Sequence, residues 1–134
     1  MVAYVAAQLI GGILGALTAR LLFDIGGPTS EPQMVTWRLA LSEVAASAGL
    51  MTVVFACARS GRKDVGPFAV GAWLFAAIVA TPSTSYANPA IAVAALCTGG
   101  PIALSLSQAL FYVPAEIVGA LIALGSVLNK DSQD

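Results

Sequence analysis

The most informative part of the sequence is TPSTSYANPAIAVAALCTGGP, residues 81–101. Asn88 is a favoured helix N-cap and Pro89 suits the first helical position, so we expect a helix to begin there. The Gly-Gly-Pro sequence at 99–101 should end it, which gives a helix over about 88–98. About ten residues at ~1.5 Å each cover only half of a bilayer. This apolar helix therefore either lies flat outside a membrane or enters it and returns.

The overall composition predicts that the chain lies in a lipid bilayer. Hydrophobic residues make up 58% of the 134 residues and charged residues only 10%, whereas ~25% charged residues is usual in a soluble domain. A soluble protein of this size needs more charge to cover its surface. Apolar stretches near spanning length lie at about 3–23, 37–58, 66–80 and 104–128. We predict an all-α integral membrane protein, one domain over 1–134, with four transmembrane helices and one reentrant half-helix.

A reentrant half-helix at 88–98 would carry non-helical backbone, residues 81–87, into the membrane. Such backbone is allowed only where protein buries it or where it lines a water-filled cavity. The hydroxyls of this segment could line such a cavity; they belong to Thr81, Ser83, Thr84 and Ser85. The start of the half-helix would direct a positive dipole end at the middle of the membrane, which opposes cations and lets neutral solutes pass.

The composition also disfavours several classes of function. The chain has no His, so the commonest metal ligand and general base near neutral pH is absent. Cys57 and Cys97 lie far apart with no CxxC partner and are typical of buried small residues. A net charge of −1 offers no basic stripe for nucleic acid. We therefore predict no enzyme activity, no metal or other cofactor, and no nucleic-acid partner.

The positions of the basic residues predict the orientation. Three of the six Lys and Arg residues lie at 59–63, and short loops rich in Lys and Arg face the cytoplasm. Both chain ends would then be cytoplasmic, in agreement with Lys130. Arg20 and Arg38 fall on the outer side, where long side chains can reach the interface. We expect a multi-pass protein of the cell membrane, plasma or inner.

An internal repeat links the first and last apolar stretches. Residues 4–12, YVAAQLIGG, align without gaps on residues 112–120, YVPAEIVGA. The two helices would run in opposite directions, so the pattern indicates a partial inverted repeat, an architecture that places a pathway between its halves. Chance similarity between two glycine-containing apolar helices is the alternative.

The triplet Asn88-Pro89-Ala90 stands after a Ser/Thr-rich loop and before a Tyr-Val-x-Ala-Glu-x-x-Gly pattern at 112–119. In this context the chain resembles the second half of the aquaporin and glycerol-facilitator family, the major intrinsic proteins, and its four spans resemble that family's third to sixth. The resemblance implies that Asn88 caps the half-helix and offers its amide to passing solute. It also implies that Glu43 braces the backbone of the reentrant loop.

The position of Glu43 is compatible with that role. It lies about two turns into the second apolar stretch, on the side from which the loop would enter. An intramembrane carboxyl is costly unless it is paired, and loop backbone would be a suitable partner. A carboxyl bonded to a neighbouring helix or reaching for interfacial water is the alternative. Glu116 occupies the repeat position of Gln8, and both are more typical of contacts between helices than of proton carriers.

Two departures from the family bear on function. The first Asn-Pro-Ala triplet and the spans before the family's third span are absent, so we expect that one copy of the chain cannot close a pore in the usual way. Ile91 follows the triplet in place of the usual Arg. A filter without Arg and His would be wider or more apolar, which favours small neutral solutes such as glycerol or uncharged metalloid acids. The candidate pore residues are Asn88, Pro89, Ala90 and Ile91.

The favoured function is an aquaporin-like channel for water or small neutral solutes, complete or lacking its first half. It would work as a homo-oligomer, a tetramer by resemblance, or with a complementary half-channel chain. The main alternative is a non-conducting truncated or degenerate relative that serves only as a membrane-embedded subunit. Half of a secondary transporter is a further alternative, which the scarcity of intramembrane charge disfavours.

Overall fold

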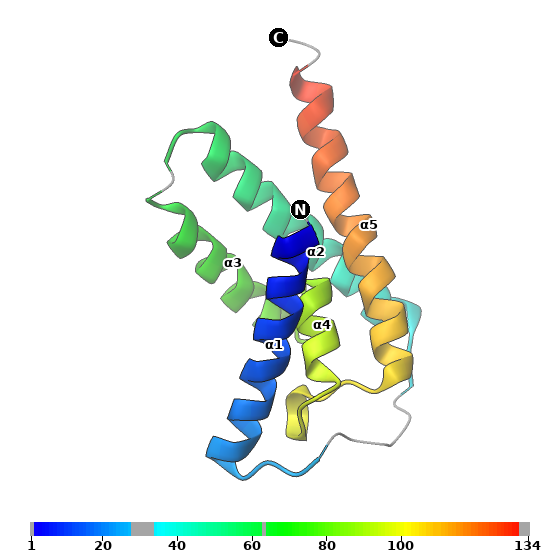
Figure 1. Cartoon of the computed structure of the whole chain (residues 1–134). Coiled ribbons are helices and arrows are strands. Elements are labelled where there is room, and N and C mark those ends of the chain that lie inside the picture. The colour runs from blue at the N-terminus through cyan, green and yellow to red at the C-terminus, as the bar shows by residue number, and fades with distance from the viewer. Residues whose placement is uncertain (1, 28–33, 63, 132–134) are drawn as a thin grey trace. The chain divides into compact units, whose positions relative to one another are not determined.

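The structure, a computed structural model, describes residues 2–27, 34–62 and 64–131, and the secondary structure of these residues is entirely helical (Figure 1). The elements are α1 (Val2–Phe23), α2 (Trp37–Arg59), α3 (Gly66–Ala80), α4 (Pro89–Ala95), the 3₁₀ helix η1 (Gly100–Ile102) and α5 (Leu106–Asp131). They form two compact units, one of Met1–Val35 with Asn88–Val113 and the other of Thr36–Ala87 with Pro114–Asp134. We call these unit 1 and unit 2.

The long helices coincide with the predicted apolar stretches. Within the described residues, three helices are long and apolar enough to cross a membrane: α1 with 22 residues, α2 with 23, and the 25 residues of α5 at Leu106–Lys130. The apolar helix α3 has only 15 residues, ~22 Å at 1.5 Å per residue, against a hydrocarbon core of ~30 Å. The helices of the described residues are thus consistent with a membrane protein, and the count of four spans plus a reentrant half-helix stays a prediction.

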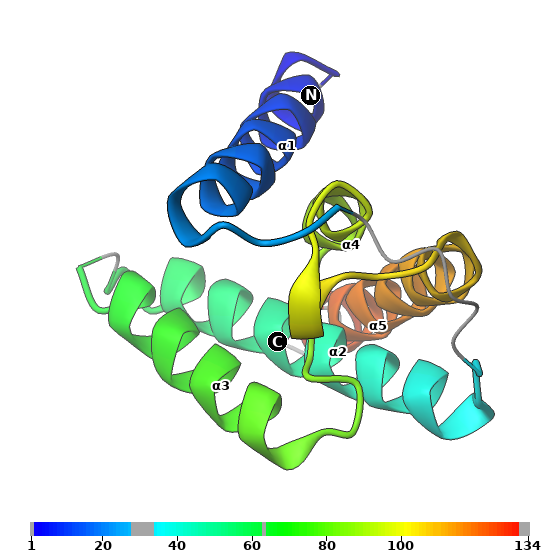
Figure 2. The same ribbon diagram turned by 90° about the horizontal axis from the view of Figure 1, so that it is seen from below.

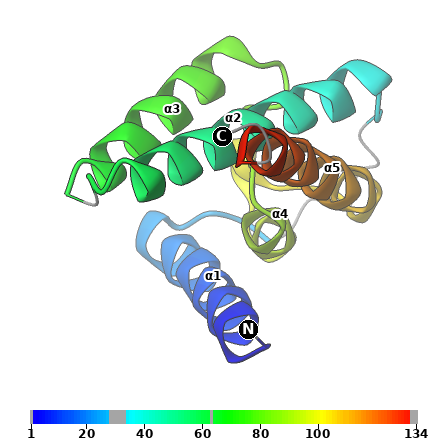
Figure 3. The same ribbon diagram turned by 90° about the horizontal axis from the view of Figure 1, so that it is seen from above.

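In unit 1, α4 lies alongside α1 (Figure 3). The closest approach is at Gly12, where an added Cβ would lie 3.1 Å from Ala94 Cβ and 3.4 Å from the Ala90 carbonyl oxygen. Small residues on both helices therefore set this contact. The GxxxG pair Gly11 and Gly15 takes no part in it, because no described atom from outside the adjacent helix backbone lies within 4 Å of their Cβ positions.

α4 ends at Ala95, before the predicted end near residue 98. The Ala95 carbonyl accepts a hydrogen bond from Leu104 N at 3.2 Å. A longer helix would need this carbonyl as an acceptor for its own backbone, so the bond from Leu104 replaces a helical one. Leu96 N and Cys97 N bond carbonyls three residues back, at 3.2 and 2.9 Å, which tightens the last turn. Competition from the following segment therefore ends the helix before the glycines are reached.

Gly99 then passes close to the chain that leaves α1. An added Cβ on Gly99 would collide with the carbonyl oxygen of Gly26 and lie 2.9 Å from Ile25 Cγ2. A side chain cannot be accommodated at this backbone-to-backbone contact, which accounts for glycine at position 99. The contact fixes the segment after α4 against the segment after α1.

α5 begins after a capping box that the sequence analysis missed. Ser105 N donates to Gln108 Oε1 at 3.0 Å, and Gln108 N donates to Ser105 Oγ at 3.3 Å. This is the reciprocal pattern of a Ser-x-x-Gln helix start, and both side chains are buried. The box places the start of α5 at Leu106, two positions after the predicted boundary of 104.

In unit 2, α2 and α3 form an antiparallel helical hairpin (Figure 2). Trp73 Nε1 donates to the Ala46 carbonyl at 2.9 Å. An added Cβ on Gly49 would collide with the Trp73 indole ring. The Trp73 ring therefore packs on the bare backbone at Gly49, and its polar N–H is satisfied at the same contact. Trp73 therefore has a packing role between α2 and α3.

The part of α5 that belongs to unit 2 packs on α2 through Gly119. An added Cβ there would collide with the Val44 carbonyl oxygen and lie 2.9 Å from Ser47 Cβ. Small residues four positions apart, here Ala115 and Gly119, are typical of such close contacts between membrane helices. Farther along, Arg59 Nη1 donates to the Val127 carbonyl at 3.5 Å.

Candidate functional site

A buried carboxylate holds the loop between α3 and α4. Glu43 is fully buried (0% exposed) on a stripe of α2 with Ala46 and Ser47, at the helical spacing of three and four residues. Its Oε1 accepts a hydrogen bond from Tyr86 N at 3.2 Å, and its Oε2 accepts one from Ala87 N at 2.9 Å. One side chain thus satisfies two successive backbone amides, each of which would cost ~1–3 kcal/mol if buried without a partner.

The loop needs such support because of its backbone conformation. Thr84, Ser85 and Ala87 have φ values of 61°, 50° and 50°, in the left-handed region that residues with a Cβ rarely adopt. The cost is of order ~1–2 kcal/mol per residue. None of these residues is a glycine, so the surrounding contacts must hold the conformation. The two hydrogen bonds to Glu43 are contacts of that kind.

The loop hydroxyls mainly bond the loop itself. Thr81 Oγ1 donates to the Ala77 carbonyl at 2.8 Å, Ser83 Oγ accepts from Ser85 N at 3.3 Å, and Thr84 Oγ1 donates to the Ser83 carbonyl at 2.6 Å. Each of these bonds uses only part of the hydrogen-bonding capacity of its hydroxyl, and the expected cavity lining stays a prediction. Ser85 Oγ is buried and has no hydrogen-bond partner among the described residues.

Asn88 follows the clamped loop directly. Its Oδ1 accepts a hydrogen bond from Ala90 N at 2.9 Å, with Pro89 at the start of the helix, as an N-cap does. No described residue accepts a hydrogen bond from Asn88 Nδ2, so this donor is available to another molecule. Ala90 is buried against α1 within unit 1, and Ile91 is 48% exposed.

The loop clamp and the helix cap are adjacent along the chain. Ala87, whose amide binds Glu43, is joined by one peptide bond to Asn88, whose side chain caps α4. Glu43 thus holds the residue that directly precedes the helix cap in the sequence.

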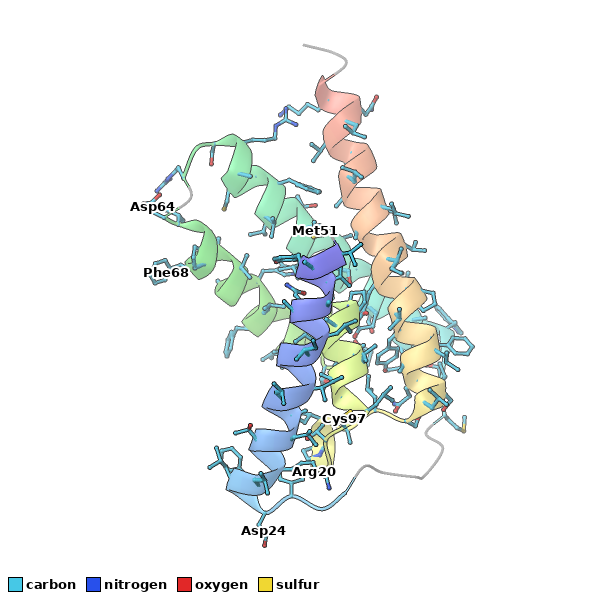
Figure 4. All side chains as sticks on the ribbon, in the orientation of Figure 1. Arg20, Asp24, Met51, Asp64, Phe68 and Cys97 are labelled. Carbon is cyan, nitrogen blue, oxygen red and sulfur yellow. The ribbon has the colours of Figure 1, made fainter. Side chains whose placement is uncertain are left out.

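A contact that the sequence analysis missed involves Arg20, in the last turn of α1. Its Nη1 donates to the Cys97 carbonyl at 3.3 Å, across a separation of 77 residues (Figure 4). The sequence suggested only that Arg20 reaches the outer interface. No local pattern connects the two positions, so only their common predicted location on the outer side could have indicated the contact.

The described side chains that could bind a metal ion do not form a cluster. Within residues 2–27, 34–62 and 64–131, no three side chains of His, Cys, Asp or Glu are grouped to hold a metal ion. Cys57 and Cys97 are free thiols, and both are half-buried.

The long apolar helices and the carboxylate-clamped loop define an α-helical membrane protein with a fixed polar segment. No family model and no solved structure matches the sequence. The chain is 37% identical over 126 residues to the aquaglyceroporin AqpS of Rhizobium meliloti (strain 1021), covering 91% of this chain and 52% of that protein. The chain is therefore related to the aquaporin family of major intrinsic proteins, as its motifs indicated. It spans about half the length of the curated relative that it matches.

Proposed function

We propose that this chain forms a membrane channel, or part of one, for water or small neutral solutes of the glycerol or uncharged metalloid acid type. Asn88, Pro89, Ala90 and Ile91 would line its narrow part, and Glu43 would hold the loop that leads to them. The similarity to an aquaglyceroporin supports the general class. The geometry of each unit supports the arrangement of the pore segment.

The observation that carries the proposal is the depth at which α4 begins. α1 has 22 residues, which gives a length of ~33 Å and matches a hydrocarbon core of ~30 Å. Gly12 lies at the middle of α1 and packs between Ala90 and Ala94, so α4 begins within about one turn of the level of Gly12. α4 then extends until Cys97 meets Arg20 in the last turn of α1. If α1 spans the membrane, α4 begins near the bilayer midplane and returns to the outer side.

The contacts of unit 2 support a loop that enters the membrane from the outer side. Glu43 lies six residues into α2, ~9 Å from its outer end, and it holds the amides of Tyr86 and Ala87. The loop that leaves α3 at Ala80 therefore turns back to the level of Glu43. Non-helical backbone at such a depth must have hydrogen-bond partners, and the Glu43 carboxylate provides them.

The available groups suit a small neutral solute with both polar and apolar parts. Asn88 Nδ2 can donate a hydrogen bond to a hydroxyl or water oxygen, and Ile91 offers an apolar side chain three positions later. An uncharged amide does not favour one ion sign, and an ion that lost its hydration shell here would be poorly compensated. Glycerol, with hydroxyls along a carbon chain, matches this combination.

The contacts of unit 2 also support the proposed orientation, with both chain ends cytoplasmic. Arg59 in the last turn of α2 bonds the Val127 carbonyl near the end of α5, so these two helix ends lie on the same side. Arg62 and Lys130 are exposed beside them. A positive cluster at these ends is typical of the cytoplasmic side.

Osmotic swelling of liposomes in glycerol tests the function. We expect the wild-type chain to swell faster than empty liposomes, and Asn88→Asp to lower the glycerol permeability about tenfold, because a carboxylate near mid-membrane is costly and cannot donate. Asn129→Asp, the same change at an exposed position of α5, is the control and should stay within about twofold of wild type. Wild-type protein that inserts but swells like empty liposomes contradicts the channel and supports the membrane-embedded subunit.

A further inference from the structure

The Arg20 guanidinium is the only cationic side chain in the described part of unit 1. The described residues of this unit contain one Arg and one Asp, Arg20 and Asp24. Asp24 is exposed, and its side chain points away from α4 in Figure 4. No described carboxylate forms an ion pair with Arg20. The positive charge of Arg20 is therefore not neutralised by a described side chain of its own unit.

The Arg20 side chain is directed at the end of α4. Its Nη1 bonds the Cys97 carbonyl at 3.3 Å, its Nη2 lies 3.6 Å from the Cβ position of Gly27, and Arg20 is half-buried. Carbonyls exposed at a helix end carry a negative partial charge that attracts cations. A guanidinium bonded to such a carbonyl reverses the local sign of the potential. Its partial burial makes that potential stronger than the potential of a fully exposed charge.

We propose that Arg20 sets the charge selectivity of the outer mouth of the channel, where it repels cations before they reach Asn88. The inference rests on the proposed function, in which the end of α4 at Cys97 faces the outer side. The segment Asn88–Ile91 has no charged side chain, so only the partial positive charge at the start of α4 opposes cations there. Arg20 adds a full positive charge from another helix, and neutral solutes pass it without penalty.

The test compares the fluxes of K⁺ and Cl⁻ from liposomes that contain the full chain, each divided by the glycerol permeability of the same liposomes. Arg20→Gln removes the charge and keeps an amide donor. It should raise the K⁺ to Cl⁻ flux ratio about a hundredfold, because one unit charge at ~10 Å and an effective dielectric of ~20 changes each flux about tenfold, in opposite directions for the two ions. A merely loosened structure would raise both fluxes together and leave the ratio unchanged.

Arg20→Lys and Arg38→Gln are the matched variants. Arg20→Lys keeps the charge and should keep the wild-type ratio. Arg38 is the other cation predicted on the outer side, but it is exposed and lies over the Trp37 ring, so Arg38→Gln should also keep the ratio. A ratio that rises equally in Arg20→Lys and Arg20→Gln would overturn the role of the charge.

A measurement on wild-type protein makes the test independent of how the variants fold. Raising the salt concentration from 0.01 to 1 M shortens the screening length from ~30 to ~3 Å, so the discrimination against K⁺ should decrease. A ratio independent of salt contradicts the proposal. Wild-type chain that passes no glycerol contradicts the proposed function and this inference with it. Wild-type chain that passes glycerol, with Arg20→Gln unchanged in ratio, contradicts this inference alone.

Discussion

Glu43 illustrates how one residue can determine the shape of a loop. An intramembrane carboxylate is costly by itself, but here each of its oxygens accepts from a backbone amide. Charge-assisted hydrogen bonds of this kind are about twice as strong as neutral ones. The loop and the carboxylate therefore stabilise each other, and removing either partner leaves the other unsatisfied.

Replacing Glu43 with Gln should destabilise the loop. The Gln side chain has one acceptor oxygen and one NH₂ group, so one of the two loop amides loses its acceptor, at a cost of ~1–3 kcal/mol. Hydrogen exchange of a peptide that covers residues 81–87, measured by mass spectrometry, should be faster in Glu43→Gln than in wild type. A lower melting temperature in detergent should accompany it.

Ser47→Ala is the matched control for this change. Ser47 lies on the same buried stripe of α2 as Glu43, and its hydroxyl has no hydrogen-bond partner among the described residues. Its removal should leave the exchange of residues 81–87 at the wild-type rate. Equal exchange in Glu43→Gln and wild type would show that the carboxylate does not hold the loop.

The helix pairs of unit 2 are built on close contacts at glycines. In the α2–α3 hairpin the Trp73 indole packs on Gly49, and in the α2–α5 contact the Val44 carbonyl oxygen lies against Gly119. Both glycines lie within helices, where glycine costs ~1 kcal/mol relative to alanine. Close packing must offset this cost, as is usual for membrane helices.

Gly49→Ala should therefore destabilise the hairpin although alanine is the better helix former. The added methyl group would displace the Trp73 ring and break its hydrogen bond to Ala46, at a cost of ~1–3 kcal/mol. Gly71→Ala in α3 is the control, because no described atom lies within 4 Å of its Cβ position. We expect Gly49→Ala to melt below wild type and Gly71→Ala at or above it; equal melting temperatures would rule out the packing role of Gly49.

The elements were easier to predict from sequence than the contacts between them. Apolar stretches located the long helices to within about three residues, since bilayer thickness and helical rise fix the length. The Asn88-Pro89 pair located the start of α4 because capping is local. The early end of α4 depends on Leu104 binding the Ala95 carbonyl, a contact that no pattern around Ala95 indicates.

The candidate site was predictable to a similar extent. The role of Glu43 followed from a family resemblance and from the cost of an unpaired carboxyl. The left-handed conformation of Thr84, Ser85 and Ala87 could not be predicted, because residues with a Cβ rarely adopt it and the sequence does not indicate it here. The contact of Arg20 with Cys97 links distant segments and depends on how α1 and α4 pack. The sequence around Arg20 and around Cys97 does not indicate how these two helices pack.

For the whole molecule, the predicted orientation can be tested by thiol labelling. The chain has two cysteines, and a variant with both changed to Ser can carry one new cysteine at a time. Met34→Cys lies in the predicted outer loop and Ser60→Cys at the predicted cytoplasmic end of α2, and both positions are exposed. A membrane-impermeant maleimide added to intact cells should label Met34→Cys and not Ser60→Cys.

Opening the membrane with detergent is the control for this labelling. Both cysteines should then react, which shows that an unlabelled thiol was protected by the membrane. Labelling of Ser60→Cys alone in intact cells would indicate the opposite orientation, with both chain ends outside.

The partners of Glu43 also have a consequence for the way in which the chain enters the membrane. Translation produces Glu43 well before Tyr86 and Ala87, the residues that satisfy it. When α2 first leaves the ribosome it therefore carries an acidic group with no native partner, and it is a poor substrate for insertion on its own. Stable integration of α2 should wait until α3 and the following loop have been synthesised, so the hairpin and its loop would be inserted together as a single biogenesis unit.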